Sequence, residues 1–109
     1  MLTCKGKGVQ ATGYEASQGF VVRSGSQATA TTVPSAQHVR GMYDLRQELI
    51  SNGVLVIQAW LYQFTQDYTF SSPSTAAAVV LGRSANGRVE WKGEDGRTLK
   101  ELQAAEAGQ

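Results

Sequence analysis

The chain has 109 residues, the size of a single domain, and its 41% hydrophobic content with nine aromatic residues predicts a folded core rather than a disordered chain. Its net charge of +1 excludes a strongly polybasic nucleic-acid binder, so any contact with nucleic acid must come from local clustering of cations. The single cysteine, Cys4, excludes an internal disulfide and a thiolate zinc site, and the single histidine, His38, excludes a histidine-rich metal site.

The sequence carries no pattern of membrane insertion or export. No apolar run reaches the ~18 residues of a membrane-spanning helix, and the N-terminus lacks the charged-then-apolar order of a secretion signal. We therefore expect a cytoplasmic protein without a membrane partner.

The first thirty residues are predicted to form two or three short strands joined by tight turns. Val9, Ala11 and Tyr14 alternate imperfectly with polar residues and glycine, and residues 20–22 form a short apolar run. Twelve glycines against two prolines in the whole chain favour hairpin turns. Residues 28–35 are small, polar or β-branched, and we expect them to connect these strands to a helix.

A long helix is predicted over residues 36–52. Pro34 and Ser35 give a helix start signal, and apolar residues then recur at the spacing of one helix face. Asn52 and Gly53 end the pattern, and Gly53 is expected to take the left-handed conformation beyond the last turn. The apolar residues of this face are Val39, Met42, Tyr43, Leu45, Leu49 and Ile50.

A β-hairpin is predicted to follow this helix. Residues 54–57 are apolar and mostly β-branched, and in residues 60–65 aromatic side chains occupy every second position. We expect the two runs to pair through a turn near Gln58 and Ala59, and residues 68–70 to resume the strand briefly.

The next segment is predicted to be a short alanine-rich helix. Ser72 supplies a side-chain oxygen that can cap the first turn, and Pro73 suits the first helical position. Residues 75–81 form the helix body, whose three alanines allow a neighbour to pack closely, and Gly82 ends it.

The C-terminal part is predicted to contain a turn, a strand and a final helix. Residues 86–87 mark the turn, residues 89–92 a short strand and residues 94–96 a second turn. Residues 98–101 have the spacing of a capping box, which starts the last helix, and residues 105–109 are expected to fray.

These elements predict one α+β domain over residues 1–109. About residues 1–30 form a β-rich N-terminal part, and about residues 36–102 form a helix–hairpin–helix–strand–helix part. We expect a small antiparallel sheet or set of hairpins with a long helix, a short alanine-rich helix and a C-terminal helix. Two arrangements stay open, a winged-helix-like one and a single sheet with helices on one face.

Five cations between residues 83 and 100 form a candidate nucleic-acid site. Against three carboxylates they leave a local net charge of +2. If the predicted turn brings Arg83 and Arg88 to one side, their guanidinium groups can hold phosphates as bidentate donors. The alternative is an ordinary solvated surface with scattered ion pairs. The candidate binding residues are Arg83, Ser84, Asn86, Gly87, Arg88 and Lys92, with the exposed serine and the backbone amides of Ser84 and Gly87 assisting.

The two tryptophans and the cysteine each have a structural interpretation. Trp91 lies beside Val89 on the predicted strand and is expected in the core, with stacking on a base as the alternative. Trp60 is expected in the core or at the hairpin edge, with an interface role second. Cys4 is expected to be a small buried hydrophobic residue.

No catalytic residue, cofactor or metal site is predicted. Ser72 and Ser74 lie in a helix-cap context without a histidine nearby, so capping explains them better than nucleophilic catalysis. Asp67 and Glu48 are not expected to share a pocket. His38 is expected to be a capping or surface residue.

A resemblance to a known family is carried by residues 71–92 and 95–102. They have the sequences S-S-P-S-T-A-A-A-V-V-L-G-R-S-A-N-G-R-V-E-W-K and D-G-R-T-L-K-E-L. This block resembles a bacterial and archaeal family of unknown function, DUF4357, with G-R and N-G signatures. The resemblance extends to residues 19–26 and 45–55 and so covers most of the chain. It implies an accessory domain of the kind that often follows a GIY-YIG nuclease module.

The same block is similar, more loosely, to the restriction-system adenine-methylase-associated domain. That domain also carries an S-P-S-x-A-A helix, a G-x-x-x-N-G turn and a tryptophan strand, and this similarity implies a part in recognising modified DNA. Arg88 stands where that family is expected to have a tryptophan, so a base-stacking role is not carried over to this position. Neither family supplies a catalytic residue.

Two functions follow as hypotheses. The first is a non-catalytic, nucleic-acid-associated accessory domain of a nuclease or restriction–modification protein, with DNA as its partner. The second is a protein-interaction or structural domain that packs on a nuclease or methylase domain, in the same polypeptide or in another subunit. A free-standing enzyme would need an acid–base pair or a metal site that the sequence does not offer.

Overall fold

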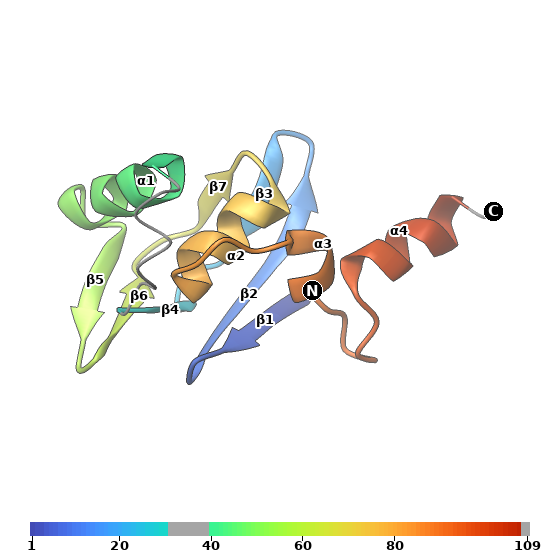
Figure 1. Cartoon of the computed structure of the whole chain (residues 1–109), viewed down its shortest axis with the longest axis horizontal. Coiled ribbons are helices and arrows are strands. Elements are labelled where there is room, and N and C mark those ends of the chain that lie inside the picture. Colours follow the sequence, from blue (N-terminus) through green and yellow to red (C-terminus); the bar gives the residue numbers. More distant parts are fainter. Residues whose placement is uncertain (31–39, 108–109) are drawn as a thin grey trace.

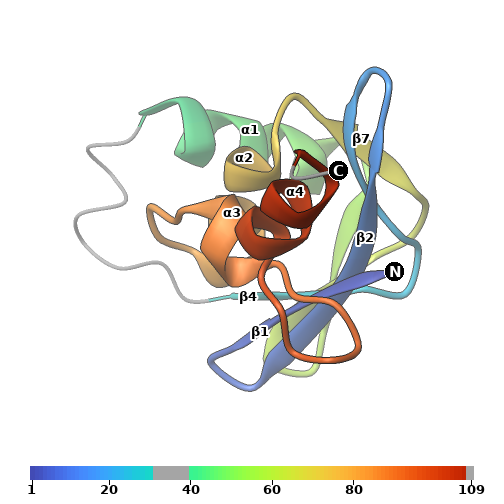
Figure 2. The ribbon, with the colours of Figure 1, turned by 90° about the vertical axis from the view of Figure 1, so that its right-hand side faces the viewer.

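The computed structural model describes residues 1–30 and 40–107. The strands are β1 (Leu2–Gly6), β2 (Val9–Ala16), β3 (Gly19–Val22), β4 (Gln27–Thr29), β5 (Leu55–Gln58), β6 (Leu61–Phe64) and β7 (Tyr68–Phe70). The helices are α1 (Arg40–Ser51), α2 (Pro73–Leu81), α3 (Gly87–Glu90) and α4 (Leu99–Ala107). The strands form two sheets rather than one, in the orders β1-β2-β3-β7 and β4-β6-β5, and all four helices lie on one side of the first sheet (Figure 1, Figure 2). The expected α+β class is confirmed.

The first sheet is built from antiparallel hairpins. Gly6 lies opposite Val9, and the two turn residues, Lys7 and Gly8, both have positive φ, as a type I′ turn requires. β3 pairs antiparallel with β2 on one side and with β7 on the other. Alternate side chains point into the core, namely Leu2, Cys4, Val9, Ala11, Phe20, Val22 and Phe70. The predicted N-terminal strands are therefore confirmed.

The second sheet contains the predicted hairpin. Gln58 lies opposite Leu61, so the turn consists of Ala59 and Trp60, one residue later than the sequence suggests. Ala59 takes the left-handed conformation there, with a φ of 56°. β4 joins the other side of β6 and includes residues 28–29, in place of the connector predicted for them. Small β-branched residues suit both a strand and a loop, and pairing with β6 decides between them.

α1 ends where the sequence predicts. Its last residue is Ser51, and Gly53 has a φ of 82°, which a residue with a side chain rarely adopts. The predicted start near residue 36 lies outside the described residues, and so does His38.

α2 confirms its predicted caps and forms the centre of the molecule. The Ser72 hydroxyl accepts a hydrogen bond from the Thr75 N–H at 3.1 Å, and Gly82 takes a φ of 68° at the other end. Residues 76–81 are all buried because the alanines let α2 lie close to the strands of both sheets. This helix therefore joins the two sheets into one core (Figure 1).

The strand predicted over residues 89–92 is wrong, because residues 87–90 form α3 instead. Trp91 then ends the helix in an extended conformation, and Lys92 makes only isolated bridges to Thr3 and Thr98. The β-branched and aromatic pair at positions 89 and 91 favours a strand locally. The helical turn prevails because it delivers Trp91 to the core while leaving Val89 in solvent.

α4 begins at the predicted capping box. The Thr98 N–H donates to Glu101 Oε1 at 3.2 Å, and the Glu101 N–H donates to Thr98 Oγ1 at 3.2 Å. Leu99 is buried at the start of the helix. The helix continues to Ala107, and the predicted fraying of its last residues stays a prediction.

Cys4 gives this fold a testable pH dependence. Burial, followed by the negative charge of Glu90, raises the pKa of the Cys4 thiol from 9.0 to about 12. Between these values the unfolded chain binds fewer protons than the folded one, so stability is complete below about pH 9 and falls as the pH rises toward 12. We expect the free energy of unfolding, measured in urea, to fall when the pH is raised from about 8 to about 10.5. The fall should be ~2 kcal/mol larger in the wild type than in Cys4→Ala, which has no thiol to titrate. An equal fall in the free energy of unfolding of the two proteins would contradict a raised pKa of the Cys4 thiol.

Candidate functional site

Arg83 follows the end of α2 and is engaged by neighbouring groups. Its Nη2 lies 2.9 Å from Oε2 of Glu90, and its Nη1 donates to the carbonyl oxygen of Ser84 at 3.1 Å. The arginine side chain is 39% exposed, so this ion pair stabilises the fold by at most about 1 kcal/mol. A phosphate would have to compete with Glu90 for the guanidinium group.

Arg88 lies on α3 and contacts α4. Its Nε donates to Oε1 of Gln103 at 2.8 Å. Residues two apart on a helix do not face each other, so Arg88 and Glu90 lie on different sides of α3. Arg83 and Arg88 thus have different partners, Glu90 and Gln103, and a shared phosphate would have to draw both side chains from these contacts.

Asn86 and Gly87 start a helix instead of forming the predicted turn. The Asn86 Oδ1 accepts a hydrogen bond from the Arg88 N–H at 3.1 Å, which makes Asn86 the N-cap of α3. Gly87 is buried, and its N–H donates to Ser74 Oγ at 2.9 Å. The predicted role of the Gly87 amide as an exposed phosphate donor is therefore wrong. Ser84 remains exposed.

Trp91 is a core residue, as predicted. It has no exposed area, and its ring centroid lies 4.6 Å from that of Phe20. Its Nε1–H donates to the carbonyl oxygen of Pro73 at 3.0 Å, which satisfies the indole group inside the core. Stacking of Trp91 on a base is excluded by this burial.

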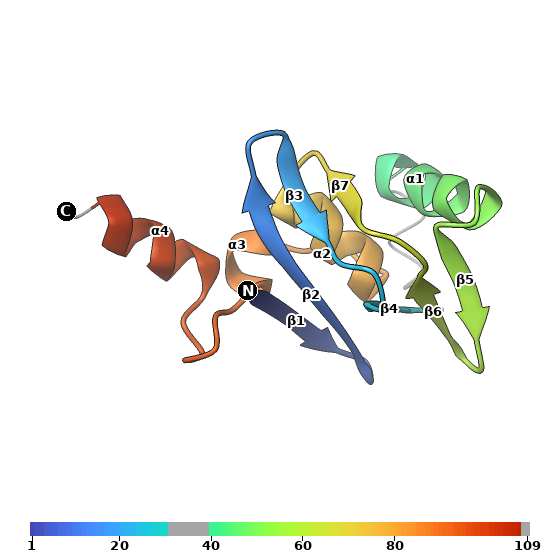
Figure 3. The ribbon, with the colours of Figure 1, turned by 180° about the vertical axis from the view of Figure 1, so that it is seen from behind.

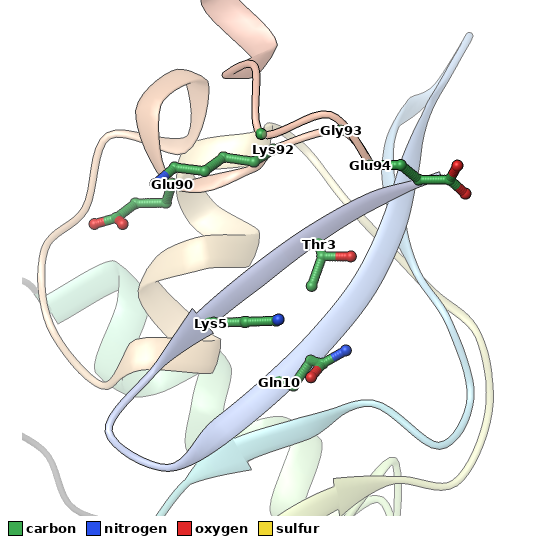
Figure 4. Close-up of a pocket in the computed structure, with 8 residues that line it drawn as sticks. Thr3, Lys5, Gln10, Glu90, Lys92, Gly93 and Glu94 are labelled. Atoms are coloured by element: carbon green, nitrogen blue, oxygen red, sulfur yellow. The ribbon is translucent and has the colours of Figure 1, made fainter.

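Lys92 borders a cleft of about 350 Å³ beside β1 (Figure 4). Its side chain extends toward Glu90, whereas Lys5 projects from β1 and Glu94 extends away from the sheet (Figure 4). The two ammonium groups therefore do not converge on one point. The lining carries both signs of charge, so the cleft is not a strong anion site.

The β5–β6 hairpin presents the most exposed large hydrophobic side chain among the described residues. Trp60 is 85% exposed in the turn, so its expected place in the core is wrong and its place at the hairpin edge is confirmed. Ile57 is 60% exposed on β5. No charged residue occurs in residues 49–66, which include the whole hairpin. The hairpin lies at one end of the long axis, and α4 lies at the other (Figure 1, Figure 3).

A small hollow adjoins the exposed tryptophan. It has a volume of about 210 Å³ and lies between the β5–β6 turn and the β1–β2 turn. Trp60 and Leu61 line it on one side, and Lys7 and Gly8 line it on the other. The hairpin tip and the β1–β2 turn thus lie side by side around this hollow.

Arg46 is a buried residue that is not among the predicted site residues. It is 2% exposed in α1, and its guanidinium group donates to the carbonyl oxygens of Val79 at 2.5 Å and of Thr29. Its Cζ lies 5.5 Å from the ring centroid of Tyr62, and burial lowers the pKa of the guanidinium group. One sequence pattern indicates that Arg46 is buried: it lies at helical spacing between Met42 and Leu49, on the apolar face of the helix.

The remaining charged groups do not form a second candidate site. Arg97 and Asp95 pair at 2.6 Å in an exposed turn, and hydrogen bonds from Arg97 lower the pKa of Asp95. In the ranges 1–30 and 40–107, no group of three or more His, Cys, Asp or Glu residues is placed to hold a metal ion. Among the helices that the structure describes, none has the length and apolar content needed to cross a membrane.

Comparison with known proteins gives one match. A family model described as a domain of unknown function, DUF4357, matches residues 2–103, which is nearly the whole chain. No curated protein and no solved structure matches the chain.

Proposed function

The chain belongs to the DUF4357 family, and we propose that it is a non-catalytic accessory domain that docks on a protein partner through the β5–β6 hairpin. The observation that carries this proposal is the exposure of Trp60 at the tip of an uncharged hairpin. An isolated domain gains nothing from an aromatic side chain in solvent, whereas tryptophan is among the residues that contribute most to protein interfaces.

The exposed side chains of the hairpin support a protein surface as its target. The centres of protein interfaces are depleted of charged residues and enriched in aromatic ones, and the exposed Val56, Ile57 and Trp60 lie in a segment without a charge. A nucleic acid would instead require cations at the contact. The partner we propose is a catalytic module, such as a nuclease or methylase domain, in the same polypeptide or in another subunit.

Site-specific cross-linking in the native host tests this docking surface. We expect a photoreactive phenylalanine analogue at position 60 to give a defined protein adduct, identified by mass spectrometry. The same analogue at Val89, which is 46% exposed on α3, is the matched control and should give none. Adding Ile57→Lys to the position-60 variant should remove the adduct. No adduct at position 60, or equal adducts at both positions, would contradict the proposal.

A second candidate function is nucleic-acid contact through the segment between α2 and α4. Arg88 and Lys92 are exposed there, and neither takes part in an ion pair within the described residues. With Arg83 they offer two or three phosphate contacts at most, so binding would be weak and sensitive to salt. Nucleic-acid association would then be a property of the surface charge and not of a shaped pocket.

The double variant Arg83→Ala/Arg88→Ala tests that candidate. It removes one partly exposed ion pair and two exposed hydrogen bonds, so we expect it to lose about 1–2 kcal/mol of stability and to stay folded. If this segment binds DNA, the variant should abolish the binding of labelled duplex or single-stranded DNA at low salt, whereas Lys7→Ala/Arg23→Ala, which removes the same charge elsewhere, should retain it. Failure of the wild type to bind either DNA would dismiss this second function.

A further inference from the structure

The outer edge of β5 is a sheet edge without a partner strand among the described residues. The edge at β1 is bridged, since Thr3 and Lys92 exchange backbone hydrogen bonds of 2.8 and 3.0 Å. The edge strands β4 and β7 are three residues long. β5 has four residues and carries neither a charge nor a proline, which are common devices that keep an edge from pairing with another chain.

The ladder between β5 and β6 shows which backbone groups the free edge presents. The Thr65 N–H donates to the carbonyl oxygen of Val54 at 2.8 Å, and this pair lies next to the pair of Leu55 with Phe64. Hydrogen-bonded and non-hydrogen-bonded pairs alternate along an antiparallel ladder. The N–H and C=O of Ile57 therefore point away from β6, toward the free edge, where the side chain is exposed as well.

We infer that this edge binds the same edge of a second copy of the chain, which joins the two β4-β6-β5 sheets across a two-fold axis at Ile57. The inference rests on the proposed docking role of the hairpin, and it assigns the β5 edge to a second copy of the chain instead of a catalytic module. Antiparallel pairing of identical strands places Ile57 opposite Ile57 of the second copy, and the two residues then exchange two hydrogen bonds. Leu55 of each copy faces the turn residue Ala59 of the other.

The absence of charge favours a second copy as the occupant. A two-fold axis brings the residues close to it near their own equivalents, so a charge at or beside Ile57 would meet a like charge. Residues 49–66 contain none, whereas the rest of the chain has nineteen charged residues. Because each edge is only four residues long, the dimer should be weak and concentration-dependent.

Sedimentation equilibrium of the full chain from micromolar to millimolar concentration tests this inference. We expect the wild type to form dimers at the upper end of this range. Ile57→Pro removes the outward N–H and leaves the β5–β6 ladder intact, so it should be monomeric with unchanged secondary structure. Ile57→Lys should be monomeric through charge repulsion, and it serves if the proline variant does not fold. The control Val89→Lys should dimerise like the wild type.

A monomeric wild type at millimolar concentration would overturn the inference, and so would a dimer that survives both substitutions at position 57. These outcomes are separable from the docking proposal. A position-60 cross-link to a different protein, together with a monomeric chain in solution, would leave the docking surface in place and remove the second copy as its partner. A cross-link of the chain to itself that Ile57→Lys abolishes would support both.

Discussion

Gly87→Ala is expected to cost the domain ~3 kcal/mol or more, which is a large fraction of the roughly 5–15 kcal/mol that stabilises an ordinary domain. A Cβ at this position would lie closer than 3.0 Å to the backbone of Pro73 and Ser74. Neither neighbour can yield, because Pro73 starts α2 and its carbonyl oxygen accepts the Trp91 indole N–H. The movement needed to admit the methyl group would therefore disturb the tryptophan at the centre of the core.

Chemical denaturation of three variants isolates this steric effect. Ser74→Ala removes the hydroxyl that accepts the Gly87 N–H and should cost ~1 kcal/mol, as an ordinary hydrogen bond does. Gly93→Ala adds the same methyl group where the nearest atoms lie at 3.4 Å, and it should change stability by less than ~1 kcal/mol. If Gly87→Ala is no less stable than Gly93→Ala, the close packing of α3 on α2 is not as described.

Gly87 is unsuitable as a test position for nucleic-acid binding because it is packed inside the fold. Gly87 belongs to the N-G signature that motivates a nucleic-acid site, yet its amide is bonded to Ser74 and its Cα faces the backbone of α2. Loss of any activity in a Gly87 variant would therefore report unfolding. Arg88 and Lys92, whose side chains are exposed, are the positions at which a loss of binding would report contact.

Local signals in the sequence were sufficient for much of the fold. The Ser72 cap, the left-handed Gly82 and the capping box at residues 98–101 each act within a few residues, so the sequence contains all that determines them. The hairpin was also predicted, with an error of one residue in its turn. That single residue matters, because it moves Trp60 from a strand face into the turn and hence into solvent.

Contacts between distant residues account for what the sequence did not reveal. Arg88 is held by Gln103, fifteen residues away, and Gly87 donates to Ser74, thirteen residues away. No local sequence pattern predicts such pairs. The strand predicted at residues 89–92 failed for the same reason: local propensity favours it, but the Asn86 cap and the packing of Gly87 on α2 select a helical turn. The free edge of β5 likewise appears only once the strand order is known.

Arg46→Met should destabilise the domain by ~3 kcal/mol and free α1 from the rest of the fold. Val79 is among the last residues of α2, where carbonyl groups lack a partner within the helix, and a guanidinium group at this end also meets the negative pole of the helix dipole. Arg46 joins this carbonyl to that of Thr29 in β4, so one side chain from α1 holds a helix and a strand.

A methionine of similar length can fill the space but cannot donate, so the carbonyl oxygens of Val79 and Thr29 would each lose the bond from Arg46. Replacing both members of a buried polar pair with apolar groups can be harmless, but here the acceptors belong to the backbone and remain. Arg46→Lys keeps the charge but lacks the planar guanidinium group, so its stability should lie between those of the wild type and Arg46→Met. Arg23→Met, at an exposed arginine, should change stability little. Hydrogen exchange should show the amides of α1 losing protection before those of the β1-β2-β3-β7 sheet. If Arg46→Met matches the wild type in denaturation and in exchange, α1 is held by its apolar face alone, and the buried charge has no part in joining α1 to α2 and β4.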